Sequence, residues 1–189
     1  RSKSHAEILK EVKKVITQGY HEIVLTGINI GDYDGGGEDK TLAQLVRDVD
    51  SIEGIKRLRI SSIDPDEIDD DLLDAVINGK HTCPSMHIVL QSGSNFILNR
   101  MRRKYSKQIF FDTCRRLKKA CPDFTFTTDV IVGFPGETQS DHEQTLEVIK
   151  EIQFSKVHMF PYSERPKTRS SRFEDKVDHA TIQKRKRDV

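Results

Sequence analysis

Residues 124–160 read FTFTTDVIVGFPGETQSDHEQTLEVIKEIQFSKVHMF, and this stretch decides the fold. Its first part, Phe124–Val132, is rich in apolar and β-branched residues and is typical of a strand. A turn with glycine and proline follows, and a helix is expected to begin at Thr138 and end near Ile152. The apolar run Lys156–Phe160 predicts a second strand. A strand, a helix and a strand in this order favour parallel strands joined by a right-handed crossover.

The same alternation extends from this stretch back to the start of the chain. Further strands are expected at residues 22–26, 57–62 and 86–90. Further helices are expected at residues 4–18, from 41 to about 49, at 67–78, from 106 to about 120 and at 178–189. Five strands with helices between them predict an α/β fold with parallel strands, either an open doubly wound sheet or a barrel. Because such units normally begin with a strand and this chain begins with a helix, we expect a first strand to be missing.

Length and composition exclude several protein classes. The chain has 189 residues, of which 35% are hydrophobic and 32% charged, and its mean hydropathy is −0.60. It contains no run of about 18 apolar residues, the length that a membrane span requires. Residues 1–14 are charged throughout, unlike a signal peptide. We therefore expect one cytoplasmic domain that has no membrane partner.

The net charge of +1 hides a strong segregation of charge along the chain. Residues 61–95 carry one Lys and seven acidic residues, whereas residues 96–128 carry nine basic and two acidic residues. From Arg165 to the end there are nine basic and four acidic residues and no apolar rhythm. The basic blocks suit a polyanion such as nucleic acid, although a solvated face is the simpler alternative. We expect residues 1–163 to form a core and residues 164–189 a basic loop and helix.

Three cysteines, Cys83, Cys114 and Cys121, have separations that match no zinc or iron–sulfur ligand motif. Free thiols in a reducing compartment are the expected state. The sequence therefore predicts no metal site within these residues.

In parallel α/β folds, ligands bind beyond the carboxyl ends of the strands. The residues there are mostly small hydroxyl or amide side chains beside glycine or proline, which suit hydroxyl groups, an amino group or an adenine edge. The candidates are Thr26, Gly27 and Asn29 after the first strand, Ser62 after the second, Gln91 and Ser92 after the third, and Gly133 after the fourth. The chain contains no nucleophile elbow, phosphate-binding loop or zinc-protease motif. We expect a bound cofactor to carry the chemistry.

Four blocks of the sequence resemble a known family. The segments LTGINIG (25–31), HIVLQSGS (87–94), MRRKY (101–105) and TDVIVGFPGET (128–138) resemble the radical S-adenosylmethionine (SAM) methylthiotransferases. The resemblance implies a partial (β/α)6 barrel, SAM as a cofactor and [4Fe-4S] clusters in the full-length protein. Two further segments, RISSIDP (59–65) and HMFPYS (158–163), are most similar to the branch that converts N6-threonylcarbamoyladenosine in tRNA to its 2-methylthio derivative.

One departure from the family is large, because its C-x3-C-x2-C cluster motif is absent. The resemblance thus implies a fragment that begins after the cluster loop and is inactive alone. It lacks the family's second-cluster domain and its carboxy-terminal RNA-binding TRAM domain. The full-length enzyme would need tRNA, an electron donor and a sulfur source. The alternatives are the isopentenyladenosine branch, the branch acting on a ribosomal protein, and a non-catalytic barrel that binds RNA or a partner.

The resemblance also implies roles for individual residues. Thr26, Gly27 and Asn29 would meet the methionyl amino group of SAM, and Ser62, Gln91 and Ser92 would hold ribose hydroxyls or the substrate base. The strand before Gly133 would lie against adenine, and Asp129 on it is either a ligand or a partner of the backbone. Arg103 would pair with the methionyl carboxylate or with tRNA phosphate, or it is simply solvated. Four basic residues would contact RNA phosphates: Arg165, Lys167, Arg169 and Arg172.

Overall fold

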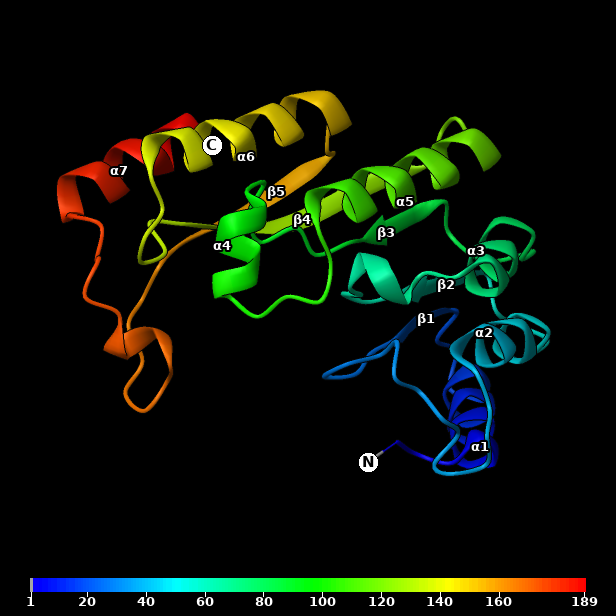
Figure 1. The fold of residues 1–189 in the computed structure, drawn as a ribbon. Helices are drawn as coiled ribbons and strands as arrows, with labels where there is room; N and C mark the ends of the chain where they lie inside the picture. Colours follow the sequence, from blue (N-terminus) through cyan, green and yellow to red (C-terminus); the bar gives the residue numbers. More distant parts are fainter. Residues whose placement is uncertain (1) are drawn as a thin grey trace. The chain divides into compact units, whose positions relative to one another are not determined.

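The computed structural model describes residues 2–189, where five strands alternate with helices (Figure 1). The strands are β1 (Glu22–Leu25), β2 (Arg57–Ile60), β3 (Ser85–His87), β4 (Thr125–Val132) and β5 (Lys156–Pro161). The α-helices are α1 (His5–Thr17), α2 (Leu42–Asp50), α3 (Asp70–Ile77), α4 (Asn95–Arg100), α5 (Lys107–Ala120), α6 (Gln139–Ile152) and α7 (His179–Asp188). Two short 3-10 helices are η1 (Pro65–Glu67) and η2 (Ser170–Arg172). The expected α/β alternation is confirmed.

The chain divides into two compact units. The first comprises residues 2–87 and 115–125, and the second comprises residues 88–114 and 126–189. The strands form a pair of order β1-β2 and a three-stranded sheet of order β3-β4-β5, and closure into a barrel is not detected among residues 2–189. The expected division into a core of residues 1–163 and an extension of residues 164–189 stays a prediction. No helix in residues 2–189 has both the length and the apolar character needed to cross a bilayer.

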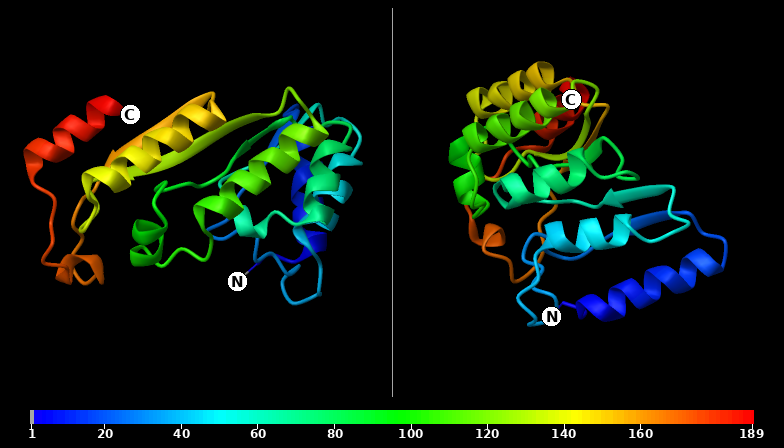
Figure 2. Two further views of the ribbon diagram at one scale, coloured as in Figure 1. Left: turned by 45° about the horizontal axis from the view of Figure 1, so that its top comes forward. Right: turned by 90° about the vertical axis from the view of Figure 1, so that its right-hand side faces the viewer.

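In the first unit, β1 and β2 are parallel, with Glu22 beside Arg57 and Leu25 beside Ile60. One face of this pair is buried and the other is open, and Val24 on the open face is 53% exposed. The helix α2 packs against both α1 and α3, so it is the central helix of the three (Figure 2). Its buried residues recur at helical spacing: Leu42, Leu45, Val46 and Val49. This apolar stripe is what places α2 against the core of the unit.

In the second unit, β4 and β5 are parallel, from Thr127 beside Lys156 to Val132 beside Pro161. Alternate residues of β4 are buried, as expected for a strand with one face toward a core. The helix α6 connects the two strands and lies along them, as Figure 1 shows. The last helix, α7, packs against β5. The parallel strands with a helix between them that residues 124–160 predict are thus confirmed, while the right-handed sense of the connection stays a prediction.

The strand expected at residues 86–90 is shorter, because a side chain replaces part of its main-chain ladder. The amide of Ile88 donates to the carbonyl of Thr127 at 3.0 Å, as in a regular sheet. The next amide, that of Leu90, instead donates to the hydroxyl of Thr128 at 3.0 Å. This hydroxyl donates in turn to the carbonyl of Ile88 at 2.7 Å. The main-chain pairing resumes where Gln91 forms an isolated parallel bridge with Val130.

The helix expected at residues 67–78 also begins later. Pro65 starts the 3-10 helix η1, and Ile68 has non-helical angles of φ −94° and ψ 83°. The α-helix then begins at Asp70, because the side chain of Asp69 accepts the amide of Leu72 as an N-cap.

Candidate cofactor-binding site

In the first unit, four expected site residues lie where β1 and β2 end. They are Thr26, Gly27 and Asn29 after β1 and Ser62 after β2, and all four are exposed. The amide of Ser61 donates to the carbonyl of Leu25 at 2.9 Å, so the two strand ends remain paired at this edge. The side-chain amide of Asn29 donates to the carboxylate of Asp32. The parallel register thus brings these four residues to one edge of the β1–β2 pair.

The same edge carries several carboxyl groups. A Cβ at Gly31 would collide with the side chain of Glu67, so only glycine allows the chain to pass this close. Burial raises the pKa of Glu67, and the nearby charges of Asp64 and Asp32 add to the increase. The edge therefore has a negative potential that favours a cationic group such as an ammonium.

In the second unit, the turn after β3 holds Gln91 in an unusual conformation. Its φ is +61°, in a region that residues other than glycine rarely adopt. The residue is 8% exposed, and its buried Oε1 atom has no hydrogen-bond partner among residues 2–189. The next residue, Ser92, is completely buried. A strained residue with an unpaired buried acceptor is typical of a ligand-binding position.

This turn is fixed to the helix α6. A Cβ at Gly93 would lie 2.5 Å from the carbonyl oxygen of Gln144, so the turn and the helix backbone are in close contact. The amide of Gly93 donates to the hydroxyl of Thr145 at 2.9 Å, and the hydroxyl of Ser94 donates to Asp141 at 2.5 Å. Burial acts to raise the pKa of Asp141, but hydrogen bonds from Ser94 and Thr138 hold that pKa below its ordinary value. The Gln-Ser-Gly-Ser block is therefore partly a packing motif.

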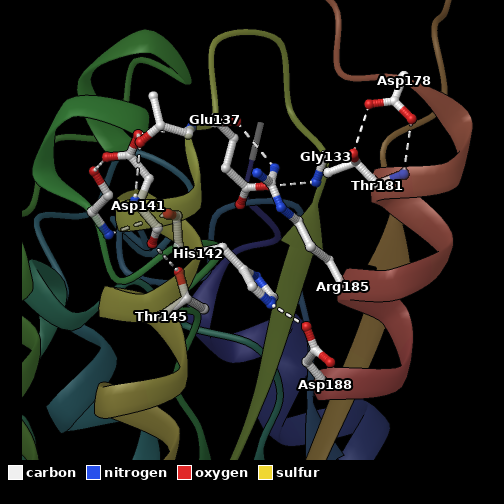
Figure 3. Close-up of polar contacts among 12 residues, drawn as sticks. Gly133, Glu137, Asp141, His142, Thr145, Asp178, Thr181, Arg185 and Asp188 are labelled. Carbon is white, nitrogen blue, oxygen red and sulfur yellow. Dashed lines mark hydrogen bonds and ion pairs between the residues drawn. The ribbon is translucent and has the colours of Figure 1, made fainter.

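The turn after β4 begins at Gly133, which has a φ of +76°. Its amide donates to Oε2 of Glu137 at 2.6 Å. The same Oε2 atom accepts a hydrogen bond from Nη1 of Arg185 on α7 at 2.7 Å, as Figure 3 shows. Both charged side chains are almost completely buried, with exposed fractions of 1% for Glu137 and 4% for Arg185. A buried ion pair thus closes the turn at the carboxyl end of β4.

Asp129 and Arg103 complete the expected cofactor residues, and both are half-buried. Asp129 lies on β4, and its carbonyl accepts the amide of Gln91 at 2.8 Å. Arg103 lies between α4 and α5, and its amide donates to the carbonyl of Leu98 at 2.9 Å. Within the second unit, the parallel bridge therefore brings Gln91 to β4 beside Asp129.

The four basic residues expected to contact RNA lie between β5 and α7. Arg165, Lys167, Arg169 and Arg172 are all exposed, and no carboxylate of residues 2–189 pairs with them. The guanidinium of Arg169 lies 5.7 Å from the ring centre of Phe173. These four side chains are therefore exposed cations without an ion-pair partner among residues 2–189, in a segment that also carries acidic residues, such as Glu164 and Glu174.

The three cysteines are free, and Cys114 is buried whereas the other two are half-buried. Burial raises the pKa of Cys114 to about 12, so this thiol stays protonated at neutral pH. Residues 2–189 contain no group of three or more His, Cys, Asp or Glu side chains that could hold a metal ion.

Three charged residues that hold these turns were not predicted as site residues from the sequence: Glu137, Asp141 and Arg185. Glu137 lies in a quoted motif after a strand, which is the signal that would have indicated it. Asp141 lies in the first turn of α6, where its spacing of three residues from the N-cap Thr138 is the signal. Arg185 carries no such signal, because it lies in the run Lys184–Arg187, which has the composition of a solvated helix face.

Comparison with known proteins identifies the family. A protein "Threonylcarbamoyladenosine tRNA methylthiotransferase MtaB" of Chlamydia pneumoniae is 50% identical over 186 residues, which cover 98% of this chain and 44% of the relative. A "tRNA-2-methylthio-N(6)-dimethylallyladenosine synthase" of Finegoldia magna is 39% identical over 98% of this chain and 40% of that protein. The expected resemblance to methylthiotransferases is thus confirmed. The chain spans less than half the length of these relatives.

The fold comparison agrees with the sequence comparison. The radical SAM enzyme coproporphyrinogen III oxidase (HemN) of Escherichia coli superposes with a TM-score of 0.69 at 16% identity, over 97% of this chain and 44% of that one. This likeness concerns the fold alone. The model of the radical SAM superfamily matches residues 1–149. By this match over most of its length, the chain belongs to the radical SAM superfamily.

Proposed function

We propose that this chain is the SAM-binding part of a tRNA methylthiotransferase that converts N6-threonylcarbamoyladenosine to its 2-methylthio derivative. The observation that carries the proposal is the identity of 50% to the relative named for that reaction, against 39% to the relative named for dimethylallyladenosine. Because the chain spans 44% and 40% of these two relatives, the activity is proposed for a longer protein that contains it.

Several features of the chain suit SAM. In the second unit, the unpaired acceptor of Gln91 would accept a hydrogen bond from a ribose hydroxyl or the substrate base, and Ser92 is a candidate for the same role. In the first unit, Ser62 is a separate candidate for a ribose hydroxyl or the substrate base. The acidic edge at the ends of β1 and β2 suits the methionyl amino group, next to Thr26, Gly27 and Asn29. Gly133 would bring the main chain at the end of β4 close to adenine, while the side chain of Ile182 fills the place where a Cβ would stand. Arg103 would hold the methionyl carboxylate, and Asp129 a hydroxyl or amino group.

Bound SAM and a [4Fe-4S] cluster would supply the radical chemistry, with electrons from a donor protein and sulfur from a separate source. The described residues offer no ligand set for the cluster. The chain's own part in the reaction is to bind and orient the cofactor by neutral hydrogen bonds. In this proposal the strands belong to a partial (β/α)6 barrel.

The tRNA would be bound in part by the exposed side chains of Arg165, Lys167, Arg169 and Arg172, which form no ion pair with a carboxylate of residues 2–189. Their contribution would weaken as salt increases, because binding releases counterions from the RNA. In this proposal, residues 164–189 form an extension of the core that leads toward an RNA-binding domain. The reaction would take place in the cytoplasm.

The test is mass spectrometry of tRNA nucleosides from cells with and without the full-length gene. Loss of only the 2-methylthio-threonylcarbamoyl nucleoside is the expected result. Loss of the isopentenyl nucleoside instead would identify the other tRNA branch. An unchanged tRNA profile would refute the proposal and favour a ribosomal-protein substrate or a non-catalytic binding role.

A further inference from the structure

The ion pair between Glu137 and Arg185 lies where the proposed cofactor meets β4. Oε2 of Glu137 accepts two hydrogen bonds, one from the Gly133 amide at 2.6 Å and one from Nη1 of Arg185 at 2.7 Å. The same Nη1 atom donates to the main-chain carbonyl of Glu137 at 3.0 Å. One guanidinium nitrogen thus holds both the side chain and the backbone at the end of the turn (Figure 3).

The helix α7 contacts this turn at a second position. A Cβ at Gly133 would collide with the side chain of Ile182, which shows that Ile182 packs directly on the glycine. Ile182 and Arg185 are three residues apart and so lie on the same face of α7. This face covers Gly133 with one apolar and one charged contact.

The segment before α7 holds the middle of the same turn. The amide of Gly136 donates to the carbonyl of Asp175 at 2.7 Å. The carboxylate of Asp175 accepts a hydrogen bond from Arg100 at 2.7 Å. The turn from Gly133 to Glu137 therefore depends on residues 175–185 for its conformation.

Stability alone does not explain why a charged pair occupies this place. Oε1 of Glu137 and Nε of Arg185 are buried without a hydrogen-bond partner among residues 2–189. Burying two charges is costly, and a pair that leaves polar atoms unsatisfied contributes little net stability compared with an apolar pair. What such a pair supplies is a fixed geometry, here the position of the Gly133 amide and its φ of +76°.

We infer that Arg185 is a positioning residue for SAM, acting through Glu137 to hold Gly133 in the conformation that receives the adenosyl group. This inference rests on the proposed function, since it assumes that SAM binds at the end of β4. It links the last helix of the chain to the cofactor, although Arg185 itself need not touch SAM.

The test compares variants of the full-length holoenzyme, prepared anaerobically with its clusters. Arg185→Met removes the guanidinium and keeps an unbranched apolar side chain in place of the arginine stem. Arg187→Met is the matched control, because Arg187 is an exposed cation on the same helix. For each protein we measure the Kd for SAM by calorimetry, the Kd for tRNA and the iron content. We also measure KM for SAM and kcat separately, to distinguish an effect on SAM binding from an effect on turnover.

We expect Arg185→Met to raise the Kd and the KM for SAM at least tenfold while its tRNA affinity and iron content stay within twofold of the wild type. Arg185→Lys, which keeps the charge, is expected to recover part of the loss. Arg187→Met should bind SAM within twofold of the wild type. A folded Arg185→Met protein that binds SAM within twofold of the wild type would overturn the inference and leave the proposed function intact. A wild-type holoenzyme that binds no SAM would instead refute the proposed function.

A second variant decides the matter if Arg185→Met does not fold. Glu137→Gln keeps the shape of the side chain and an oxygen acceptor for the Gly133 amide, but it weakens the contact with Arg185. It should raise the Kd for SAM in the same direction, by at least threefold. Unchanged SAM binding in this variant, or failure of both variants to fold, would show that the pair serves folding alone and would overturn the inference.

Discussion

Gly93→Ala adds a single methyl group at a position where the chain lies directly against the backbone of α6. Gly93 has no positive φ, so alanine is compatible with its backbone conformation. The obstacle is space, because the added Cβ would lie 2.5 Å from the carbonyl oxygen of Gln144 and 2.6 Å from Cα of Thr145. Both atoms belong to the backbone of α6, so no side-chain rotation relieves the collision. The turn and the helix must separate.

The cost of this separation is estimated from the contacts that it breaks. Overpacking of a dense region costs about 1–3 kcal/mol. The turn also loses the hydrogen bond from the Gly93 amide to Thr145 and weakens the bond from Ser94 to Asp141. A neutral buried bond contributes about 1 kcal/mol, and one to a charged group about 1.5–3 kcal/mol. Alanine recovers about 0.4–1 kcal/mol by restricting the unfolded chain. The free energy of unfolding should fall by about 3 kcal/mol.

The measurement is urea denaturation followed by circular dichroism, together with hydrogen exchange of the peptide that contains residues 88–100. The matched control is Gly27→Ala, since a Cβ there lies at an ordinary distance of 3.5 Å from Ile30. The control should change the free energy of unfolding by less than about 1 kcal/mol. If Gly93→Ala and Gly27→Ala have equal stability, the close packing of the Gln-Ser-Gly-Ser turn on α6 is wrong.

Three further predictions follow from single contacts. Gly133→Ala should lower the free energy of unfolding by at least about 1–2 kcal/mol, because alanine is strained at the left-handed φ of this position. The added Cβ also collides with the side chain of Ile182, so the double variant with Ile182→Ala should lose less stability than the sum of the two single variants; urea midpoints whose shifts simply add would contradict this. Cys114 should not react with iodoacetamide at pH 8 until the protein unfolds, since burial raises its pKa to about 12. Carbamidomethylated Cys114 found by mass spectrometry in the native protein would contradict this. Burial lowers the pKa of His142 although Asp188 acts to raise it, so the unfolded state binds a proton at higher pH than the folded state does. The free energy of unfolding should therefore fall as the pH decreases from about 7 through the lowered pKa. The urea midpoint of His142→Gln should fall less than that of the wild type over the same pH range.

The order of strands and helices was predictable because it depends on local patterns. Thr138 was recognised as the residue before a helix, and its side chain indeed accepts the amide of Asp141. The alternation of burial along β4 likewise follows from side chains that point to opposite faces of a strand. Details that depend on partners distant in sequence were missed. The strand expected at residues 86–90 ends at His87 because the hydroxyl of Thr128 takes over two of its hydrogen bonds.

The candidate site divides in the same way. Glycines, hydroxyl groups and amides at the strand ends were recognisable from the sequence, since parallel strands place those residues at one edge. That Gln91 has a buried oxygen without a partner depends on the packing around it, and no property of glutamine indicates it.

The sequence by itself determined that this is an α/β chain of parallel strands with polar, glycine-containing turns at their carboxyl ends, and its motifs indicated the family. These features are encoded by neighbouring residues, whose spacing sets helix, strand and turn. Only the tertiary structure showed that Arg185, in a run of four basic residues, is buried against Glu137 while its neighbour Arg187 is exposed. The physical reason is that the sequence records charge but not burial, and burial depends on contacts between residues that are 48 positions apart.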